Sequence, residues 1–332
     1  MKDFTGKIAF ITGGASGAGF GQAQIFSEAG MKVVIADVRQ DHLDEAMAYF
    51  KEKGAPVHAI KLDVTDREGY VKAADEAERV FGGAPDLLVL TAGVNVFGPA
   101  EASTYDDYDW VVGVCFGGVV NGLVTFVPRM IKAGKGGYIA ATVSWGAFGA
   151  GAMVAPYSAA KAAVLNLMES YYQALKPYGI GVSTICPANI KSRIYEAALL
   201  NRPENLNNTG YNVNEKTQEF LASIHTHGME PRDLAEWLKK GIENDQFLII
   251  PYPSGPRMVE LELRRFVEYA SPEGMRRLEE RQQQPPTEEQ LKMMSEREGY
   301  EIKPGPRKIF SSDSGFAKAR ADIDWVDPSK KL

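Results

Sequence analysis

The sequence predicts an α/β fold built on one doubly wound parallel sheet, followed by a C-terminal extension. Two observations lead to this prediction. Short apolar runs alternate with helical stretches until about residue 255, as expected when helices cover both faces of a parallel sheet. In addition, the first apolar run leads directly into a glycine-rich loop. Hydrophobic residues make up 45% of the 332 residues, which suffices for a core of this size.

The first expected strand covers residues 7–11 and continues into the glycine-rich loop, after which a helix begins near Gly19. Glycines permit a tight turn and let a pyrophosphate approach the backbone, and the following helix offers free N–H groups to the anion. Strand, loop and helix in this order indicate a Rossmann-type dinucleotide site. Its expected phosphate-binding residues are Thr12, Gly13, Ser16, Gly17 and Gly19. A glycine-rich turn without a ligand is the alternative, and it does not require this order.

The second expected strand, residues 32–36, ends at Asp37, roughly 20 residues after the glycines. A carboxylate at this place can hold the hydroxyl groups of the adenosine ribose and repels a 2′-phosphate. Asp37 therefore favours NAD over NADP as the coenzyme. Arg39 stands two residues further on and could compensate for a 2′-phosphate, which keeps NADP open as the alternative.

A later strand, residues 138–143, ends at Ser144, which places this hydroxyl at the carboxyl edge of the sheet, where ligands bind in open α/β folds. Tyr157 and Lys161 lie four positions apart on the next helix and face the same way. An adjacent ammonium group favours the phenolate and lowers the pKa of a phenol from about 10. Taken singly, the three residues could be a strand-end cap, a half-buried aromatic ring and a solvated charge. Together with the glycine loop they indicate a site for proton transfer.

With these motifs, residues 5–255 resemble the short-chain dehydrogenase/reductase family, in its group with Thr-Gly-x-x-x-Gly-x-Gly. The resemblance implies an enzyme in which the Tyr157 phenolate takes the proton of an alcohol while a hydride passes to the nicotinamide. Ser144 would hold the substrate oxygen, and Lys161 would bind the nicotinamide ribose and lower the pKa of Tyr157. The implied substrate is a small-molecule secondary alcohol or ketone.

The same resemblance implies further contacts to the coenzyme after three other strands. Asp63 and Val64 would flank the adenine. The family's Asn-Ala-Gly is matched by Thr91, Ala92 and Gly93, where Thr91 replaces the Asn and keeps a hydrogen-bonding side chain. The nicotinamide amide would be held by Pro187, by the backbone of Ile190 and by the hydroxyl of Ser192.

The family's catalytic tetrad also contains an Asn, which helps hold a water that connects the Lys to solvent. Alignment on the family pattern places Cys115 at that position, whereas Asn121 lies six residues later and does not fit. A thiol is a weak hydrogen-bond partner, but the family mechanism assigns much of the water contact to a backbone carbonyl, which Cys115 retains. We therefore expect a slower enzyme. A NAD-binding protein whose catalysis is impaired is the alternative.

Aromatic and apolar side chains are expected around the substrate, with residues 191–229 as a mobile lid. The expected lining consists of Val94, Asn95, Phe97, Trp145, Phe148, Met153 and Tyr195. Such walls suit an aromatic or otherwise bulky secondary alcohol. Motifs in residues 11–21, 187–192 and 224–231 also resemble the Cα-dehydrogenases of bacterial lignin β-aryl ether breakdown, which oxidise a benzylic alcohol with NAD. A dehydrogenase of hydroxysteroids or aliphatic alcohols is the alternative.

Composition and charge argue against several other classes of protein. The net charge of −6 and a pI near 5.5 disfavour binding to nucleic acid or to an anionic membrane. We expect no apolar run long enough to cross a bilayer. Cys115 and Cys186 fall in expected core segments and suggest no disulfide framework, so a cytoplasmic location is the simplest inference. His225 and His227 lack a neighbouring Cys or carboxylate cluster, so no metal site is expected.

The dehydrogenase domain is expected to span residues 1–270 and to end in an amphipathic helix over residues 258–270. Residues 271–332 form a charged, proline-broken extension, for which partial disorder or wrapping over the surface is favoured. In the alternative, the extension covers a neighbouring subunit or the substrate mouth. Its anchors would then be Ile309, Phe310, Phe316 and Trp325. The family resemblance further implies a homodimer or homotetramer formed through helices near residues 106–132 and 155–178.

Overall fold

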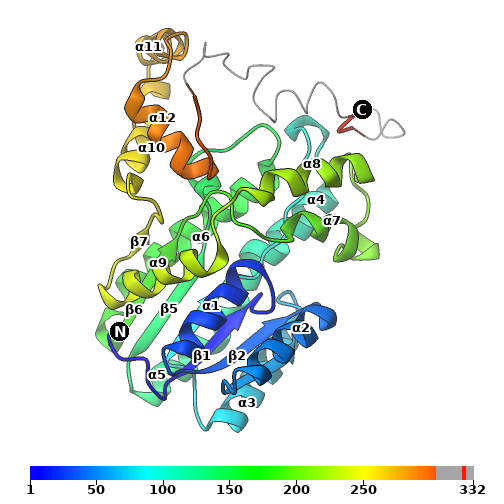
Figure 1. Cartoon of the computed structure of the whole chain (residues 1–332), viewed down its shortest axis with the longest axis vertical. Coiled ribbons are helices and arrows are strands. Elements are labelled where there is room, and N and C mark those ends of the chain that lie inside the picture. Colours follow the sequence, from blue (N-terminus) through cyan, green and yellow to red (C-terminus); the bar gives the residue numbers. More distant parts are fainter. Residues whose placement is uncertain (304–323, 327–332) are drawn as a thin grey trace.

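The computed structural model describes residues 1–303 and 324–326 of the chain. Its centre is a parallel sheet with the strand order β3-β2-β1-β4-β5-β6-β7 (Figure 1). The strands are β1 (Ile8–Thr12), β2 (Lys32–Asp37), β3 (Val57–Lys61), β4 (Leu87–Leu90), β5 (Gly137–Thr142), β6 (Ile180–Ile185) and β7 (Leu248–Ile249). The order reverses between β1 and β4, which confirms the doubly wound fold and places a ligand crevice at this switch point.

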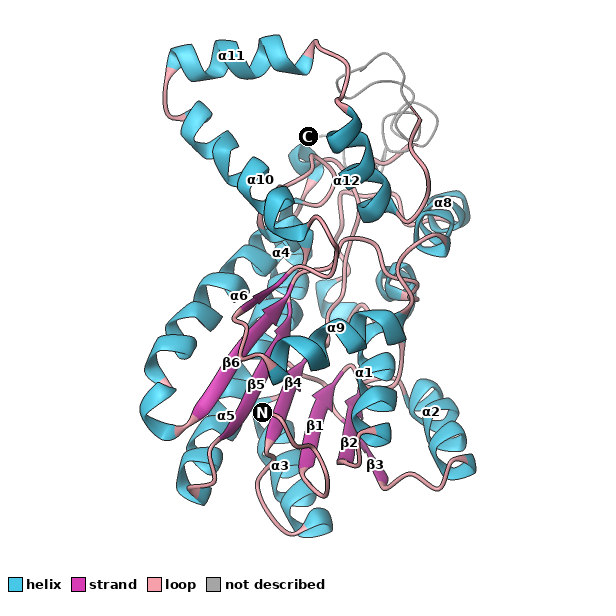
Figure 2. Ribbon diagram, turned by 60° about the vertical axis from the view of Figure 1, so that its left-hand side comes forward, coloured by secondary structure: helices cyan, strands magenta, loops and turns pink. Residues whose placement is uncertain are grey.

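Helices cover both faces of the sheet (Figure 2). One face is covered by α1 (Gly17–Glu28), α2 (Gln40–Glu52) and α9 (Pro231–Glu243). The other face is covered by α3 (Arg67–Phe81), α5 (Gly118–Ala133) and α6 (Ala155–Ala174). Successive strand residues point to opposite faces, so Phe10 of β1 packs in the second core layer and its neighbour Ile11 in the first.

One continuous helical stretch, Tyr105–Ala133, runs along the second face and consists of α4 (Tyr105–Val112), a π-helical turn (Gly113–Gly117) and α5. By length and composition this stretch could cross a membrane, so the expectation that no apolar run has this length was wrong. Half of its most apolar window is buried inside the fold, which is typical of a core helix in a sheet domain.

Most of the described chain beyond the sheet is helical. It forms α10 (Gly255–Tyr269), α11 (Pro272–Gln282) and α12 (Glu288–Glu298). The helices α11 and α12 were not predicted from the sequence. Wrapping over the surface does describe α12, because Met293 is buried in the core and Glu296 accepts hydrogen bonds from the backbone and side chain of Ser254 at 3.1 and 3.0 Å.

Among the proposed anchors of the extension, Trp325 is described and its side chain is only 2% exposed. The indole ring packs edge-on against Phe220, with the ring centroids 5.9 Å apart. Ile309, Phe310 and Phe316 lie outside the described residues. The described part of the extension thus contacts residues 1–270 through α11, whose Arg281 pairs with Glu268, through α12, and through Tyr300 and Trp325.

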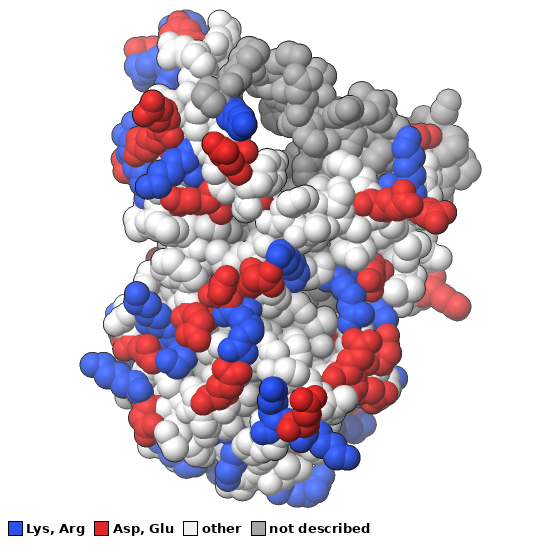
Figure 3. Space-filling view, viewed as in Figure 1, with Lys and Arg blue, Asp and Glu red and all other residues white. Residues whose placement is uncertain are grey.

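Acidic and basic side chains are interspersed over the face shown in Figure 3. Exposed ion pairs join neighbouring helices, as Arg232 of α9 does with Glu28 of α1 at 2.8 Å. Each such exposed pair contributes at most about 1 kcal/mol to stability. Apolar packing on the two sheet faces is therefore the main source of stability.

Candidate active site

A cavity of about 370 Å³ lies at the carboxyl edge of the sheet, beside the switch point between β1 and β4. The ends of six strands, β1 to β6, contribute to its walls. Predicted residues that line it are Gly13, Ser16, Gly17, Gly19, Asp37, Asp63, Val64, Thr91, Ala92, Gly93, Ser144, Tyr157, Lys161, Pro187, Ile190 and Ser192. Segments separated by up to about 180 residues in the sequence are thus brought together in one crevice.

The glycine loop lies so close to neighbouring backbone that its glycine positions have no room for a side chain. Gly13 and Gly17 have positive φ angles of 64° and 49°. A Cβ on Gly13 would lie 2.8 Å from the Ala92 Cα, and one on Gly19 would lie 2.0 Å from the Gly13 carbonyl oxygen. Thr12 stands behind the loop, where its hydroxyl accepts hydrogen bonds from the backbone N–H groups of Thr91 and Ala92 at 3.0 and 3.2 Å. The loop is therefore shaped for an anion that contacts backbone.

Asp37 closes one end of the cavity and is only 9% exposed. Its carboxylate accepts hydrogen bonds from the backbone N–H of Ala15 at 3.3 Å and of Arg39 at 3.1 Å. Burial raises the pKa of Asp37, and these N–H groups oppose that rise. The Arg39 guanidinium is paired with Asp41. Sequence reasoning missed His42, which lines the same end and whose Nε2 is buried without a hydrogen-bond partner among the described residues.

Lys161 is almost completely buried beside Tyr157, as their spacing on α6 requires. Its Nζ lies 5.5 Å from the centre of the Tyr157 ring and donates to the Thr142 carbonyl at 2.8 Å. The Thr142 hydroxyl in turn meets Thr91 at 2.8 Å and Gln22 of α1 at 3.0 Å. Thr91 also donates to Gln22, at 2.6 Å. Thr91, which replaces the Asn of the family's Asn-Ala-Gly, thus belongs to a polar network that fixes the end of β5. Lys161 is held at this strand end.

Burial is the main influence on Tyr157 and raises its pKa above the ordinary value. The positive charge of Lys161 and a hydrogen bond with Ser144 act in the opposite direction. The expected lowering by Lys161 is present, but burial outweighs it in the coenzyme-free protein. Ser144 also caps a short turn, since its hydroxyl accepts from the backbone N–H of Gly146 at 3.1 Å.

Cys115 lies in the π-helical turn and is fully buried. Its Sγ donates to the Val94 carbonyl at 3.1 Å and accepts from the Val94 N–H at 3.4 Å, which joins the helix to the segment after β4. Burial raises the pKa of this thiol, although the nearby Lys161 opposes the shift. Asn121 instead donates to the Val64 carbonyl at 2.9 Å and is not a substitute for the tetrad Asn.

The residues predicted to line the substrate pocket fall into separate groups. Val94 lines the cavity, and Asn95 is buried next to it with no partner for its Oδ1 among the described residues. Trp145 and Phe148 contact each other, with centroids 5.7 Å apart, and pack on the sheet core. The third group consists of Phe97, Met153 and Tyr195. These side chains pack with Leu221 and Trp325 in a small apolar cluster. Their role in substrate binding stays a prediction.

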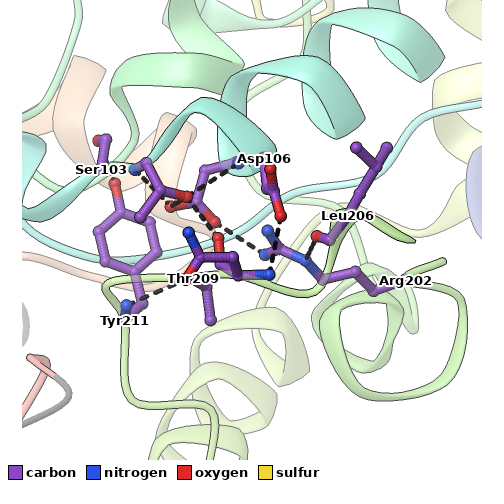
Figure 4. A network of polar contacts seen from close by, with 9 residues as sticks. Ser103, Asp106, Arg202, Leu206, Thr209 and Tyr211 are labelled. Atoms are coloured by element: carbon purple, nitrogen blue, oxygen red, sulfur yellow. Dashed lines mark hydrogen bonds and ion pairs between the residues drawn. The ribbon is translucent and has the colours of Figure 1, made fainter. Parts of the chain in front are cut away.

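The expected lid, residues 191–229, is largely helical and includes α7 (Ala197–Leu200) and α8 (Glu215–Thr226). Its middle is fixed to α4 by Arg202, which donates to Asp107 at 2.8 Å and to the Leu206 carbonyl at 2.6 Å (Figure 4). Both side chains of the Arg202–Asp107 pair are buried, at 3% and 0% exposure. Tyr211 joins Ser103 in the same network (Figure 4).

Sequence reasoning did not assign several residues on this side of the cavity to the site. They are Asp109, Trp110, Gly113, Val114, Pro203 and Leu206. His225 also lines the cavity; the sequence favoured a surface or substrate-loop role for it over metal binding. Within residues 1–303 and 324–326, no group of three His, Cys, Asp or Glu side chains is placed to hold a metal ion.

The comparisons agree with this geometry. The profile of the short chain dehydrogenase family matches residues 7–202. The chain belongs to this family. A C alpha-dehydrogenase of Sphingobium sp. strain SYK-6 is 54% identical over 272 residues, which cover 82% of this chain and 89% of the relative.

Solved structures of the family are also similar. The apo form of LigD from Sphingobium sp. strain SYK-6 has a TM-score of 0.68 and 47% identity, over 81% of this chain and all of that one. A short-chain dehydrogenase/reductase from Burkholderia phymatum in complex with NAD has a TM-score of 0.72 and 30% identity. That match covers 79% of this chain and 94% of the other. The chain is therefore an oxidoreductase with the short-chain dehydrogenase fold.

Proposed function

We propose that this protein is a NAD-dependent dehydrogenase that oxidises a bulky aromatic secondary alcohol to a ketone, with the alcohol in the benzylic position. One observation carries the proposal: Ser144, Tyr157 and Lys161 line the same cavity as the glycine loop and Asp37. This arrangement brings a proton acceptor next to a site for a nicotinamide coenzyme. The glycine loop fits such a coenzyme, because Gly13, Gly17 and Gly19 line the cavity without side chains and lead into the N-terminus of α1.

The residues at the adenosine end favour NAD. The Asp37 carboxylate lies at the end of β2, where ribose hydroxyls would add donors to the N–H groups already bound. A 2′-phosphate would meet this buried acid. Arg39, which could have balanced that phosphate, is already engaged by Asp41. The structural neighbour from Burkholderia phymatum was solved with NAD.

A bound nicotinamide ring would supply the hydride acceptor for the reaction. Tyr157 takes the hydroxyl proton of the alcohol, and Ser144 holds the same oxygen by a hydrogen bond. The buried charge of Lys161 stabilises the phenolate form of Tyr157. Cys115 contributes its packing and its bonds to Val94, which hold the segment beside Lys161 in place.

The substrate class rests on the relatives and on the cavity. The similar protein from Sphingobium is named a C alpha-dehydrogenase, and the motifs resemble the lignin β-aryl ether group. Trp110, Val114 and Leu206 give the cavity apolar walls. These walls suit the rings of an aryl-glycerol aryl ether.

The test is NADH formation by the pure protein with NAD or NADP and a racemic aryl-glycerol aryl ether, beside hydroxysteroids and aliphatic secondary alcohols. Turnover of the aryl ether with NAD supports the proposal. Turnover of a steroid alone would keep the dehydrogenase and reject the benzylic substrate. Binding of NADH without turnover of any alcohol would favour the impaired binding protein instead, with Cys115 as the first residue to revert to Asn.

We further propose a dimer or tetramer in a reducing cytoplasm, with a dehydrogenase domain at residues 1–270 and an extension beyond it. The helical stretch Tyr105–Ala133 leaves Tyr105, Tyr108 and Val124 exposed at 88%, 39% and 63%, which suits a helix-to-helix interface. Both cysteines are buried free thiols. Sedimentation of the purified protein tests the assembly, and a monomer at micromolar concentration would reject it.

A further inference from the structure

His225 occupies the last turn of α8 and forms part of the cavity wall. Its ring stacks against Tyr195 with centroids 6.0 Å apart and an interplanar angle of 24°. One ring nitrogen, Nδ1, lies 3.2 Å from the carbonyl oxygen of Ile190. The other, Nε2, is buried and has no hydrogen-bond partner among the described residues.

These contacts determine the chemical character of the free nitrogen. A carbonyl oxygen can only accept, so Nδ1 must carry the hydrogen of the pair. Burial lowers the pKa of His225 and favours the neutral ring. In this tautomer Nε2 is a bare hydrogen-bond acceptor. A buried acceptor left unpaired destabilises a protein by about 1–3 kcal/mol, so a partner supplied by a ligand would recover this energy.

The ring is held firmly to the loop that should face the nicotinamide. The backbone N–H of Met229 donates to the Asn189 carbonyl at 2.9 Å, and the backbone N–H of Lys191 donates to the Met229 carbonyl at 3.0 Å. Gly228 permits this contact, because a Cβ there would lie 2.6 Å from the Ile190 carbonyl carbon. His225 is therefore fixed beside the cavity, and its unpaired Nε2 is an acceptor that the proton-transfer residues do not use.

We propose that His225 is a specificity-determining residue whose Nε2 accepts a hydrogen bond from a substrate hydroxyl other than the one oxidised. The inference rests on the proposed dehydrogenase function and deepens it. An aryl-glycerol aryl ether offers two such donors, a primary hydroxyl on the glycerol chain and, in phenolic members, a ring hydroxyl. One of these two donors satisfies the buried nitrogen, and an alcohol that lacks that donor leaves it unpaired.

The test compares three substrates: a phenolic aryl-glycerol aryl ether, its phenol methyl ether, and an analogue with methyl in place of the primary carbinol. The wild-type protein should prefer one hydroxylated compound over its matched analogue by at least about fivefold in kcat/KM. The analogue with the lower kcat/KM identifies the hydroxyl: the phenol methyl ether points to the ring hydroxyl, and the methyl analogue points to the primary hydroxyl. In His225→Phe, which keeps a flat ring against Tyr195, the preference should fall to about one, mainly through KM.

His227→Phe is the matched control, because His227 is exposed and its Nδ1 lies 3.4 Å from the Ser223 carbonyl. It should keep the wild-type preference. His225→Gln retains an acceptor and should restore part of the preference, which guards against a folding defect in the Phe variant. Equal loss with all three substrates would overturn the inference, as would a raised Kd for NADH, which would assign Nε2 to the coenzyme. If the wild-type protein oxidises none of these alcohols, the proposed function fails first and the inference with it.

Discussion

The cavity has two walls that are built differently. The strand-edge wall, made by residues 13, 16–19, 37, 63–64 and 91–93, lies at the ends of neighbouring parallel strands. The loop wall, made by residues 193–206 with His225, depends on side chains that reach other segments. Arg202 bonds Asp107 across 95 residues and Arg39 approaches Asn201 across 162. A site can therefore combine a wall fixed by sheet geometry with one fixed by individual side-chain contacts, and the two should respond differently to mutation.

Tyr157→Phe should have the largest effect on activity and none on either wall. Removing the phenol oxygen removes the group that takes the proton, and such acid–base groups contribute about 10²- to 10⁴-fold. We expect kcat to fall about a thousandfold or more, while the Kd for NADH stays within about twofold of the wild type. Steady-state kinetics and a fluorescence titration measure the two quantities. Retained turnover would remove Tyr157 from the reaction.

Arg202→Met should damage the loop wall through stability. The substitution leaves Asp107 charged and buried, and breaking a buried pair in this way destabilises by about 3–5 kcal/mol. Denaturant unfolding should show a loss of that order. Arg232→Met is the control, because its pair with Glu28 is exposed and should cost less than about 1 kcal/mol. Equal losses in the two variants would show that the Arg202–Asp107 pair has no special role.

The same difference explains how much could be predicted from the sequence. Gly13, Asp37 and Ser144 are found from their place at strand ends, because the sheet repeats one local geometry and each motif is continuous in the chain. The doubly wound parallel sheet and the residues near Tyr157 were predicted for this reason. Arg202 carries no such signal, and the motif around His225 does not reveal its contacts, since the partners of both residues are identified only after the chain has folded.

The substrate pocket illustrates the limit most clearly. Phe97, Met153 and Tyr195 were selected as aromatic or apolar residues near the motifs, yet they pack around Leu221 and Trp325. Trp325 comes from the extension, far along the chain, and although it was named as a possible anchor, no local pattern could identify these partners. The helices α11 and α12 were also missed, because their polar sequences resemble a solvated tail until the contacts of Met293 and Glu296 are known.

Lys161→Met tests, through the pH dependence of the rate, whether the charge of Lys161 sets the ionisation of Tyr157. Alcohol oxidation needs the phenolate, so the rate rises with pH as Tyr157 loses its proton. Burial raises the pKa of Tyr157 and the Lys161 charge lowers it, so removal of that charge should move the rising limb of the pH–rate profile to higher pH. At neutral pH we expect kcat to fall about a hundredfold.

Lys176→Met provides the control, since Lys176 lies 4.3 Å from the Tyr172 ring in a similar pair that does not line the cavity. Its profile should match that of the wild type. If the limb of Lys161→Met stays in place, the charge of Lys161 does not set the ionisation of Tyr157.

Glu298→Ala should give the smallest effect and decides whether the extension belongs to the site. Glu298 of α12 accepts a hydrogen bond from Asn189 at 3.1 Å, in the loop that should face the nicotinamide. A single hydrogen bond of this kind contributes about 0.5–1.5 kcal/mol, so the Kd for NADH should rise about threefold. Glu296 lies on the same helix as Glu298. Glu296→Ala removes the hydrogen bonds with Ser254 and should leave the Kd for NADH unchanged. Both variants weaken the docking of α12, so a rise of the Kd in both would mean that the position of the whole helix matters. If the Kd rises in neither variant, coenzyme binding does not depend on the extension. A rise in Glu298→Ala alone would show that one long-range contact tunes a loop whose motif the sequence already identifies.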